Sequence, residues 1–221
     1  MIKRSVGRPK LLNREHVINT AFCEYWSYGI NNVTVSKVAK IAGISRPGIY
    51  IEFKNEDSLK AEVLKKYIFE CAKPVHKNYD NYKQYPNHLV NHLHALINDG
   101  GGDTLLTDDN KYNNIDRPEN AVGCLLLRSI LNKFTLGPIS QKIISEFELY
   151  RIEQFTKYII NAQKDDIINK NLDINFYARY LHWVFGLIQI MRLNGSNNND
   201  VTNVINTALI PLFKEKNVLN S

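Results

Sequence analysis

Apolar residues recur every three or four positions through most of this chain, which is the spacing of helices that bury one face. The pattern predicts helices over residues 13–28, 34–42, 47–53, 55–73, 88–98, 121–134, 138–164, 174–193 and 201–213. Between two of them, residues 99–120 contain three consecutive glycines and an Asp/Asn-rich run, which predicts a flexible insertion. The sequence therefore predicts an all-α fold.

The segment TVSKVAKIAGISRPGIYIEFK, residues 34–54, carries the clearest local signals. Thr34 is suited to cap one helix, and Gly43 lies where that helix must end. Ser45 is suited to cap a second helix, with Pro47 in its first turn. Two helices joined by a short glycine turn make a helix-turn-helix, whose second helix enters the major groove of DNA. The alternative is an ordinary helical hairpin.

Positive charge is concentrated in the same third of the chain. The 221 residues carry a net charge of +6, and all of it belongs to residues 1–73, because residues 74–221 contain 15 basic and 15 acidic side chains. A basic domain attracts a polyanion through phosphate neutralisation and counterion release. The segregation of charge therefore favours DNA binding over the hairpin alternative.

A basic arm, MIKRSVGRPKLL, precedes the first predicted helix. Arg4, Arg8 and Lys10 surround a Gly-Arg-Pro segment that can lie in the narrow minor groove of A·T-rich DNA, where the potential is most negative. The alternative is a disordered tail, and the sequence leaves both interpretations open.

Several positions at fixed spacing carry a family resemblance. They are the run from Thr34 through Ala39, then Ala42-Gly43-Ile44-Ser45, Gly48-Ile49-Tyr50, Phe53-Lys54-Asn55 and Leu59. This pattern, which follows a Gly-Arg-Pro-Lys arm and one helix, resembles the signature of TetR-type transcriptional regulators. The resemblance implies an all-α homodimer with an N-terminal three-helix helix-turn-helix domain and a C-terminal helical ligand-binding and dimerisation domain. Most members of that family are repressors that a small molecule releases from DNA.

The resemblance also implies which residues meet DNA. Arg46 begins the second helix of the motif, where its guanidinium can bind O6 and N7 of a guanine together. Gly48 leaves room for close approach to DNA or for a thymine methyl group. The alternative is that Gly48 only leaves space in the packing of the helices. With the arm, the expected DNA-binding residues are Arg4, Arg8, Lys10, Thr34, Ser36, Lys37, Ser45, Arg46, Pro47, Gly48, Tyr50 and Lys54.

Two acidic residues depart from the family pattern near the expected DNA surface. Glu56 stands where many members have a lysine that reaches a phosphate, and Glu52 stands where many have a neutral residue. Either Glu52 accepts from a cytosine amino group or it points away from the groove. The phosphate contact is then expected from Lys54.

The remaining chain predicts a second functional region. We expect domains at residues 1–54 for DNA binding and 74–221 for ligand binding and dimerisation, with a connecting helix at 55–73. The predicted helix 174–193 is apolar nearly all round, so it needs covering on more than one side. A second subunit is the natural cover, and we expect a homodimer through helices 138–164 and 174–193.

A cysteine in this region is a candidate for chemistry. The string Gly123-Cys124-Leu125-Leu126 resembles one in a subset of TetR-like ligand domains, some of which sense electrophiles or oxidants through a cysteine. A reactive thiol needs a basic neighbour, which Arg128 could supply, and the alternative is a buried inert cysteine. The expected ligand-binding residues are His92, Leu96, Cys124, Arg128, Phe134, Phe147 and Tyr150.

Other kinds of site find little support. His88, His92 and His94 share one predicted helix, but a zinc site needs further ligands that the sequence does not place, so we expect no metal and no cofactor. The three cysteines lack a CxxC spacing, which is typical of reduced thiols in a cytoplasmic protein. The basic N-terminus does not resemble a signal peptide, and the apolar stretch 180–191 is too short to cross a bilayer.

These observations predict a DNA-binding transcriptional regulator, most simply a dimeric repressor that a small-molecule ligand releases from a palindromic operator. The first alternative is a regulator that is triggered by covalent modification of Cys124. A DNA-binding protein without a ligand and a helical enzyme are further alternatives. We expect no enzyme, because the glycines lack the phosphate-loop pattern and no Cys/His pair is placed by the sequence.

Overall fold

The computed structural model describes residues 13–74, 89, 92, 93, 96, 117–121 and 123–212. These residues form helices and their connections, and they contain no strand, which confirms the all-α prediction. The α-helices are α1 Arg14–Tyr28, α2 Val35–Ile41, α3 Arg46–Phe53, α4 Glu56–Tyr67, α7 Leu125–Leu131, α8 Pro138–Lys164, α9 Ile174–Leu193 and α10 Asn198–Leu209. A π-helical segment, Ile68–Ala72, continues α4, and 3-10 turns cover Lys133–Thr135 and Ile210–Leu212.

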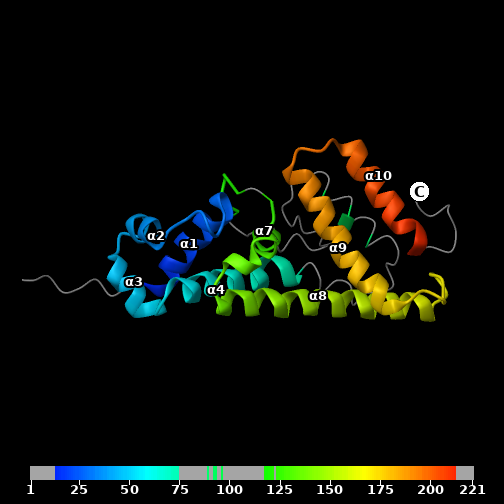
Figure 1. The fold of residues 1–221 in the computed structure, drawn as a ribbon, viewed down its shortest axis with the longest axis horizontal. Helices are drawn as coiled ribbons and strands as arrows, with labels where there is room; N and C mark the ends of the chain where they lie inside the picture. Colours follow the sequence, from blue (N-terminus) through cyan, green and yellow to red (C-terminus); the bar gives the residue numbers. More distant parts are fainter. Residues whose placement is uncertain are drawn as a thin grey trace, which may run out of the picture.

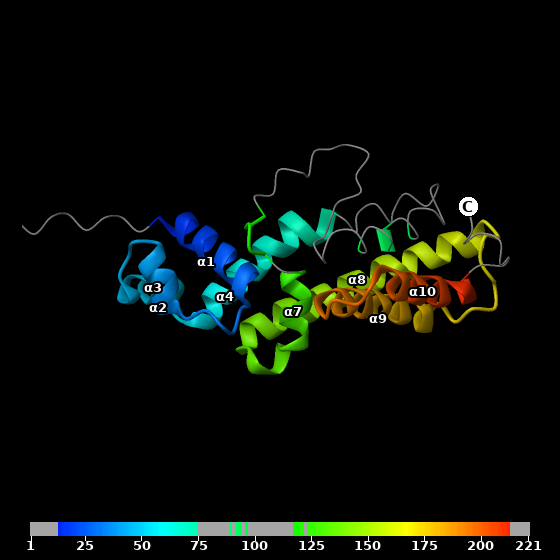
Figure 2. The ribbon, with the colours of Figure 1, turned by 90° about the horizontal axis from the view of Figure 1, so that it is seen from above.

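The molecule is elongated, with α1, α2 and α3 grouped at one end and α10 near the other (Figure 1). The long helix α8 runs along much of the length and packs against both α4 and α9. Seen from above, α7 lies between the N-terminal group and the α9–α10 pair (Figure 2). The arrangement therefore gives α8 and α7 contact with both halves of the protein.

Side-chain caps start the N-terminal helices where the sequence predicts. Asn13 accepts the amide of His16 at the start of α1, and Thr34 accepts the amide of Lys37 at 3.2 Å at the start of α2. Ser45 accepts the amide of Gly48 at 3.2 Å and begins α3. Each cap pairs a backbone N–H group that has no partner within its own helix.

Two buried clusters hold the fold. The first joins α1–α4 to α7 and the beginning of α8, and the second joins the rest of α8 to α9 and α10. In the first, Trp26 of α1 packs edge-on against Phe22 and against Tyr67 of α4, with ring centroids 5.3 Å and 5.0 Å apart. Because Cys124 and Leu127 also belong to this cluster, one core spans the boundary expected near residue 74.

The structure corrects three predicted helices. The helix expected over residues 121–134 covers only Leu125–Leu131, because Gly123 has a left-handed φ of +62° and Cys124 caps the helix. The helix expected over 55–73 is α-helical only to Tyr67 and then π-helical. The helix expected from residue 201 begins three residues earlier, where Asn197 caps it. Of the helix expected over 88–98, the described residues Leu89, His92, Leu93 and Leu96 are helical, and the rest of it lies outside the described residues, as does most of the insertion 99–120.

Candidate DNA interface and effector cavity

One face of α3 anchors the helix and the opposite face is open. Ile49 and Phe53 are buried at 0% and 3% exposure, and they hold α3 against α2 and α4. Ile51 projects from the opposite face with 84% of its surface exposed. Arg46 is exposed at the N-terminal end of α3, donates to the Tyr50 hydroxyl at 3.2 Å, and holds its guanidinium 5.4 Å from the Tyr50 ring centroid. These contacts hold an Arg side chain in place on the exposed surface of the helix.

The other DNA-binding candidates occupy different places. Pro47 and Lys54 are exposed on α3 or at its end, Ser36 is exposed on α2, and Gly48 is half-buried. Lys37 binds Glu24 at 2.8 Å and lies 3.9 Å from the Tyr28 ring centroid, so it already has protein partners. Thr34 and Ser45 are the helix caps described above. Arg4, Arg8 and Lys10 lie outside the described residues.

The two acidic residues of this region are paired. Glu52 lies 3.1 Å from Arg14 of α1, and the same Arg14 reaches Glu62 of α4 at 3.1 Å. Glu56 binds Lys60 one helical turn on, at 2.8 Å. The pairing with Arg14 turns Glu52 toward α1, which is the second of the two orientations considered for it. Sequence reasoning had not singled out Arg14, since nothing local marks its partners 38 and 48 residues away.

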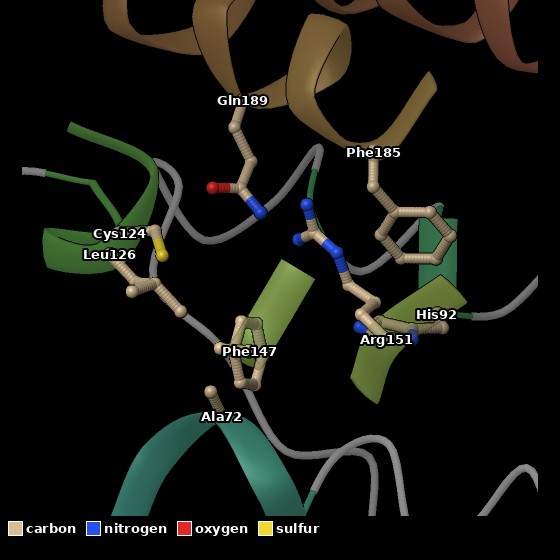
Figure 3. A pocket seen from close by; sticks show the side chains of 8 residues that line it. All are labelled: Ala72, His92, Cys124, Leu126, Phe147, Arg151, Phe185 and Gln189. Carbon is tan, nitrogen blue, oxygen red and sulfur yellow. The ribbon is translucent and has the colours of Figure 1, made fainter. Parts of the chain in front are cut away.

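A small cavity lies between the C-terminal end of the π segment, the start of α7, and the facing sides of α8 and α9 (Figure 3). We call it the effector cavity. Its free volume of about 10 Å³ is room for about one water molecule. Its lining residues are Ala72, His92, Cys124, Leu126, Phe147, Arg151, Phe185 and Gln189.

Three of the residues predicted to bind a ligand meet at this cavity: His92, Cys124 and Phe147. The structure does not bring the other four to it. Leu96 is buried in the second core, and Phe134 is 92% exposed in the 3-10 turn that follows the early end of α7. Arg128 extends toward α1, and Tyr150 packs its ring against Phe147 and Lys73.

Two polar residues of the cavity escaped sequence reasoning. Arg151 of α8 and Gln189 of α9 are 7% and 4% exposed. Arg151 sits within an otherwise apolar stripe of its helix, and Gln189 shares a helix face with His182, seven residues earlier. A polar residue on the apolar face of a helix was therefore the sequence signal for a cavity residue. Periodicity alone does not say which of these polar residues faces the interior.

A buried polar network supports Arg151. Its Nε donates to Nδ1 of His182 at 2.9 Å, so a neutral His182 carries its proton on Nε2, 3.8 Å from Glu148. Burial lowers the pKa of His182, and the positive charge of Arg151 lowers it further. The interaction with His182 lowers the pKa of Glu148, which also binds Lys133 at 2.8 Å. The network holds the Arg151 side chain at a defined position in the cavity wall.

Hydrogen bonds link the cavity wall to the DNA-binding helices. The Trp26 indole of α1 donates to the carbonyl of Gly123 at 2.8 Å, in a buried position next to Cys124. Arg128 of α7 donates back to the Trp26 carbonyl at 2.7 Å. A displacement of Gly123 or Cys124 therefore acts directly on α1.

A second link joins α4 to α8. The Asp57 carboxylate accepts the backbone amides of Ile139 at 2.8 Å and Ser140 at 3.1 Å, which are unpaired groups at the start of α8. Ser140 in turn donates its hydroxyl to the Asp57 carbonyl at 3.3 Å. Because Asp57 lies four residues after the end of α3, this contact places the start of α8 close in the chain to the second helix of the helix-turn-helix.

Among the described residues, no group of three or more His, Cys, Asp or Glu side chains is placed to hold a metal ion. Nor is any helix in the described part of the chain both long and apolar enough to cross a membrane.

Comparison with known proteins places these features in a family. Residues 17–63 match the family model described as bacterial regulatory proteins, tetR family. Over 212 residues, 94% of this chain and 92% of its relative, the chain is 22% identical to the HTH-type transcriptional repressor ComR of Escherichia coli K12.

Two solved structures illustrate the common fold. One is a cysteine mutant of the TetR family regulator CifR in complex with a 26-base-pair operator DNA, with a TM-score of 0.68, 17% identity, and coverage of 93% of this chain and 100% of that one. The other is NemR of E. coli in its reduced form, with a TM-score of 0.68, 12% identity, and coverage of 90% and 96%. Residues 17–63 are thus a TetR-type DNA-binding domain, and the chain as a whole has the fold of the TetR-family transcriptional regulators.

Proposed function

We propose that this regulator is a dimeric repressor, which leaves a palindromic operator when a small molecule enters the effector cavity. The observation that carries the proposal is the hydrogen bond from Trp26 to Gly123, because it joins the cavity wall to the helix-turn-helix domain. Two similar proteins agree with this role, since ComR is a transcriptional repressor and CifR forms a complex with operator DNA. Because its partner is DNA, we propose a cytoplasmic location.

The exposed face of α3 supports DNA recognition in the major groove. Arg46 is held on that surface by Tyr50, and a guanidinium can take both acceptors of a guanine. Lys54 and the basic arm supply phosphate and minor-groove contacts in this proposal. A dimer with two such helices about one DNA turn apart reads a palindromic site.

An apolar stripe on α9 supports dimerisation. Phe176, Trp183 and Leu187 are 52%, 61% and 45% exposed, and their spacing of seven and four places them on one face of the helix. Leu149 of the neighbouring helix α8 is 62% exposed. Large apolar side chains grouped in this way mark an interface. We propose that α8 and α9 of two subunits form a four-helix contact around a two-fold axis.

The size of the cavity supports a mechanism of release. Its walls come from the π segment, α7, α8 and α9, and its present volume admits no more than about one water molecule. A ligand must therefore move those walls apart. Such a movement reaches α1 through Gly123 and reaches α4 through α8 and Asp57, and it changes the distance between the two recognition helices.

The test uses Trp26→Phe, which keeps an aromatic ring and removes the indole donor. We expect the variant to bind a selected palindromic DNA with nearly wild-type affinity and to respond at least tenfold less to an effector found by screening. Phe134→Leu, which changes an aromatic side chain that is 92% exposed, is the control. An unchanged response of Trp26→Phe would contradict this route. DNA binding that varies little between 50 and 200 mM salt would contradict the proposed phosphate contacts.

A second candidate trigger is covalent modification of Cys124. This cysteine lines the effector cavity, is 6% exposed, and follows the residue bound by Trp26. An adduct there would occupy the cavity without a separate binding equilibrium. The test compares alkylation by N-ethylmaleimide at neutral pH in Cys23→Ser and in Cys23→Ser with Cys124→Ser, because Cys23 is exposed and would react independently. DNA release that persists without Cys124, or an adduct at Cys124 with full DNA binding, would rule it out.

A further inference from the structure

One atom of the effector cavity lacks a hydrogen-bond partner among the described residues. Gln189 is 4% exposed, and its Oε1 is buried with no donor from that part of the chain. In Figure 3 this oxygen is directed toward the side of Cys124, while the amide nitrogen of Gln189 is turned toward Arg151. A buried acceptor in this situation requires a donor, which a water molecule or a bound organic molecule can supply. The cavity thus presents an acceptor for a hydroxyl or N–H group.

A fixed positive charge lies across the same space. The Arg151 guanidinium and the Gln189 amide point into a common volume between α8 and α9 (Figure 3). The eight described lining residues carry this one fixed positive charge and no carboxylate. Because Nε of Arg151 donates to Nδ1 of His182 and Nη2 lies 3.4 Å from Nε2 of the same ring, the guanidinium keeps a defined direction. A planar guanidinium held in this way matches the geometry of a carboxylate.

The rest of the wall selects an organic molecule. Ala72, Leu126, Phe147 and Phe185 are apolar, and His92 packs edge-on against the Phe185 ring at 4.8 Å between centroids. An inorganic anion would leave these surfaces without a partner, whereas a short carbon skeleton would cover them. The small present volume favours a molecule with few non-hydrogen atoms.

We propose that the effector is a small carboxylic acid in its ionised form, with a hydroxyl or N–H group beside the carboxylate. The carboxylate binds Arg151, the neighbouring donor binds Oε1 of Gln189, and the carbon skeleton packs between Phe147 and Phe185. This assignment rests on the proposed function, because it names the chemical class that enters the effector cavity. Neither residue was among those predicted from the sequence.

The experiment pairs each acid with its uncharged amide. Carboxylates of two to five carbons, with and without a 2-hydroxyl group, are compared with the corresponding primary amides by thermal shift and by release of fluorescent operator DNA. Glycolate and lactate represent the hydroxylated set. We expect the 2-hydroxy acids to raise Tm and release DNA, with at least a tenfold weaker effect from the amides and from acids without the hydroxyl group.

Variants locate the two contacts. Gln189→Leu keeps a side chain of similar volume and is expected to remove the preference for the hydroxyl group. Arg151→Lys keeps the positive charge without the fork and is expected to weaken every acid at least tenfold, while Arg151→Gln abolishes the response. Lys142→Gln removes an exposed charge from the same helix and is the control. If Arg151→Gln does not fold, Arg151→Lys and Gln189→Leu still carry the test.

The outcomes separate the ligand class from the general function. If uncharged compounds raise Tm and release DNA while no acid does, the proposed function stands and the carboxylate assignment is overturned. An acid and its amide that act equally, or inorganic phosphate that acts as well as the acids, would also overturn it. If the acids raise Tm through Arg151 without affecting DNA, the site is supported and ligand-controlled release is contradicted.

Discussion

Asp57 and Gly137 lie in direct contact, so that a Cβ atom at Gly137 would come within 2.6 Å of Oδ2 of Asp57. The contact is possible only because residue 137 has no side chain, and it allows Asp57 to reach the first amides of α8. Gly137 has an ordinary φ of −74°, so the requirement here is space and not an unusual backbone conformation. These two residues join α4, the helix that follows α3, to α8, the longest helix among the described residues.

We expect Asp57→Ala to lower the free energy of unfolding by about 1 kcal/mol, because two amides at a helix N-terminus lose their acceptor. Gly137→Ala should have a comparable or larger effect, since the new methyl group pushes Asp57 away. Chemical unfolding followed by circular dichroism measures both. Gly186→Ala is the matched control, because its Cβ would meet Leu127 at an ordinary 3.6 Å. A neutral Gly137→Ala would contradict the contact.

Arg46 is expected to specify one base pair. Arg46→Ala should cost about 1–3 kcal/mol at a single guanine and make the four base pairs at that position more nearly equal in affinity. The measurement is binding to a set of operators that differ at one position. Lys40→Ala, on the exposed side of α2, serves as the control. A loss that is uniform across all operators would show that Arg46 contacts only phosphate.

Ile51 is expected to contact a thymine methyl group, because it projects from the side of α3 opposite the buried Ile49 and Phe53. Replacing individual thymines of the operator with uracil removes the methyl group and nothing else. One such replacement should weaken the wild-type protein severalfold and leave Ile51→Ala unaffected. If each replacement of thymine by uracil changes the DNA affinity of the wild-type protein and of Ile51→Ala by the same factor, Ile51 contacts no methyl group.

Trp183 is expected to lie at the centre of the dimer contact. Trp183→Glu places a charge in the apolar stripe of α9 and should convert the protein to a folded monomer with weakened operator binding. Sedimentation and circular dichroism measure assembly and folding. Ile41→Glu makes the same chemical change at an exposed apolar residue of α2 and should leave the assembly intact. A Trp183→Glu variant that stays dimeric would place the interface elsewhere.

Stability is expected to fall as the pH drops below about 6.5, the ordinary pKa of histidine. Burial lowers the pKa of His182 in the folded protein, so the unfolded chain takes up the proton first. The stabilisation is present above the unfolded pKa and is lost as the pH falls through the folded pKa. His182→Gln should flatten the dependence of Tm on pH between 7.5 and 5.5, and His16→Gln on the surface of α1 is the control. An unchanged slope in His182→Gln would contradict a buried neutral imidazole.

Several parts of the fold follow from short-range signals. Asn13, Thr34 and Ser45 each bond an amide within the next three residues, so their roles can be predicted without tertiary information. The π segment Ile68–Ala72 and the short length of α7 could not be predicted in the same way. For α7 the reason is a contact between residues far apart in the sequence. Gly123, just before the helix, lies against Leu193, and a Cβ at Gly123 would come within 2.6 Å of that side chain.

The residues of the candidate site were also only partly predictable from the sequence. His92, Cys124 and Phe147 were predicted from residue type and meet at the cavity, whereas Phe134 was predicted on the same grounds and lies in solvent. An apolar pattern says that one face of a helix is covered but not what covers it. When α7 ends at Leu131, the following turn carries Phe134 away from the core.

By itself, the sequence determined the helices, their caps, the helix-turn-helix and the family of DNA-binding regulators, because these depend on residue spacing within about twenty positions. Only the tertiary structure decided that Trp26 holds Gly123, that Asp57 caps α8, and that Arg151 and Gln189 face one cavity. These pairs are separated by 97, 82 and 38 positions. No periodicity specifies which residues meet over such distances, since that depends on how whole helices pack.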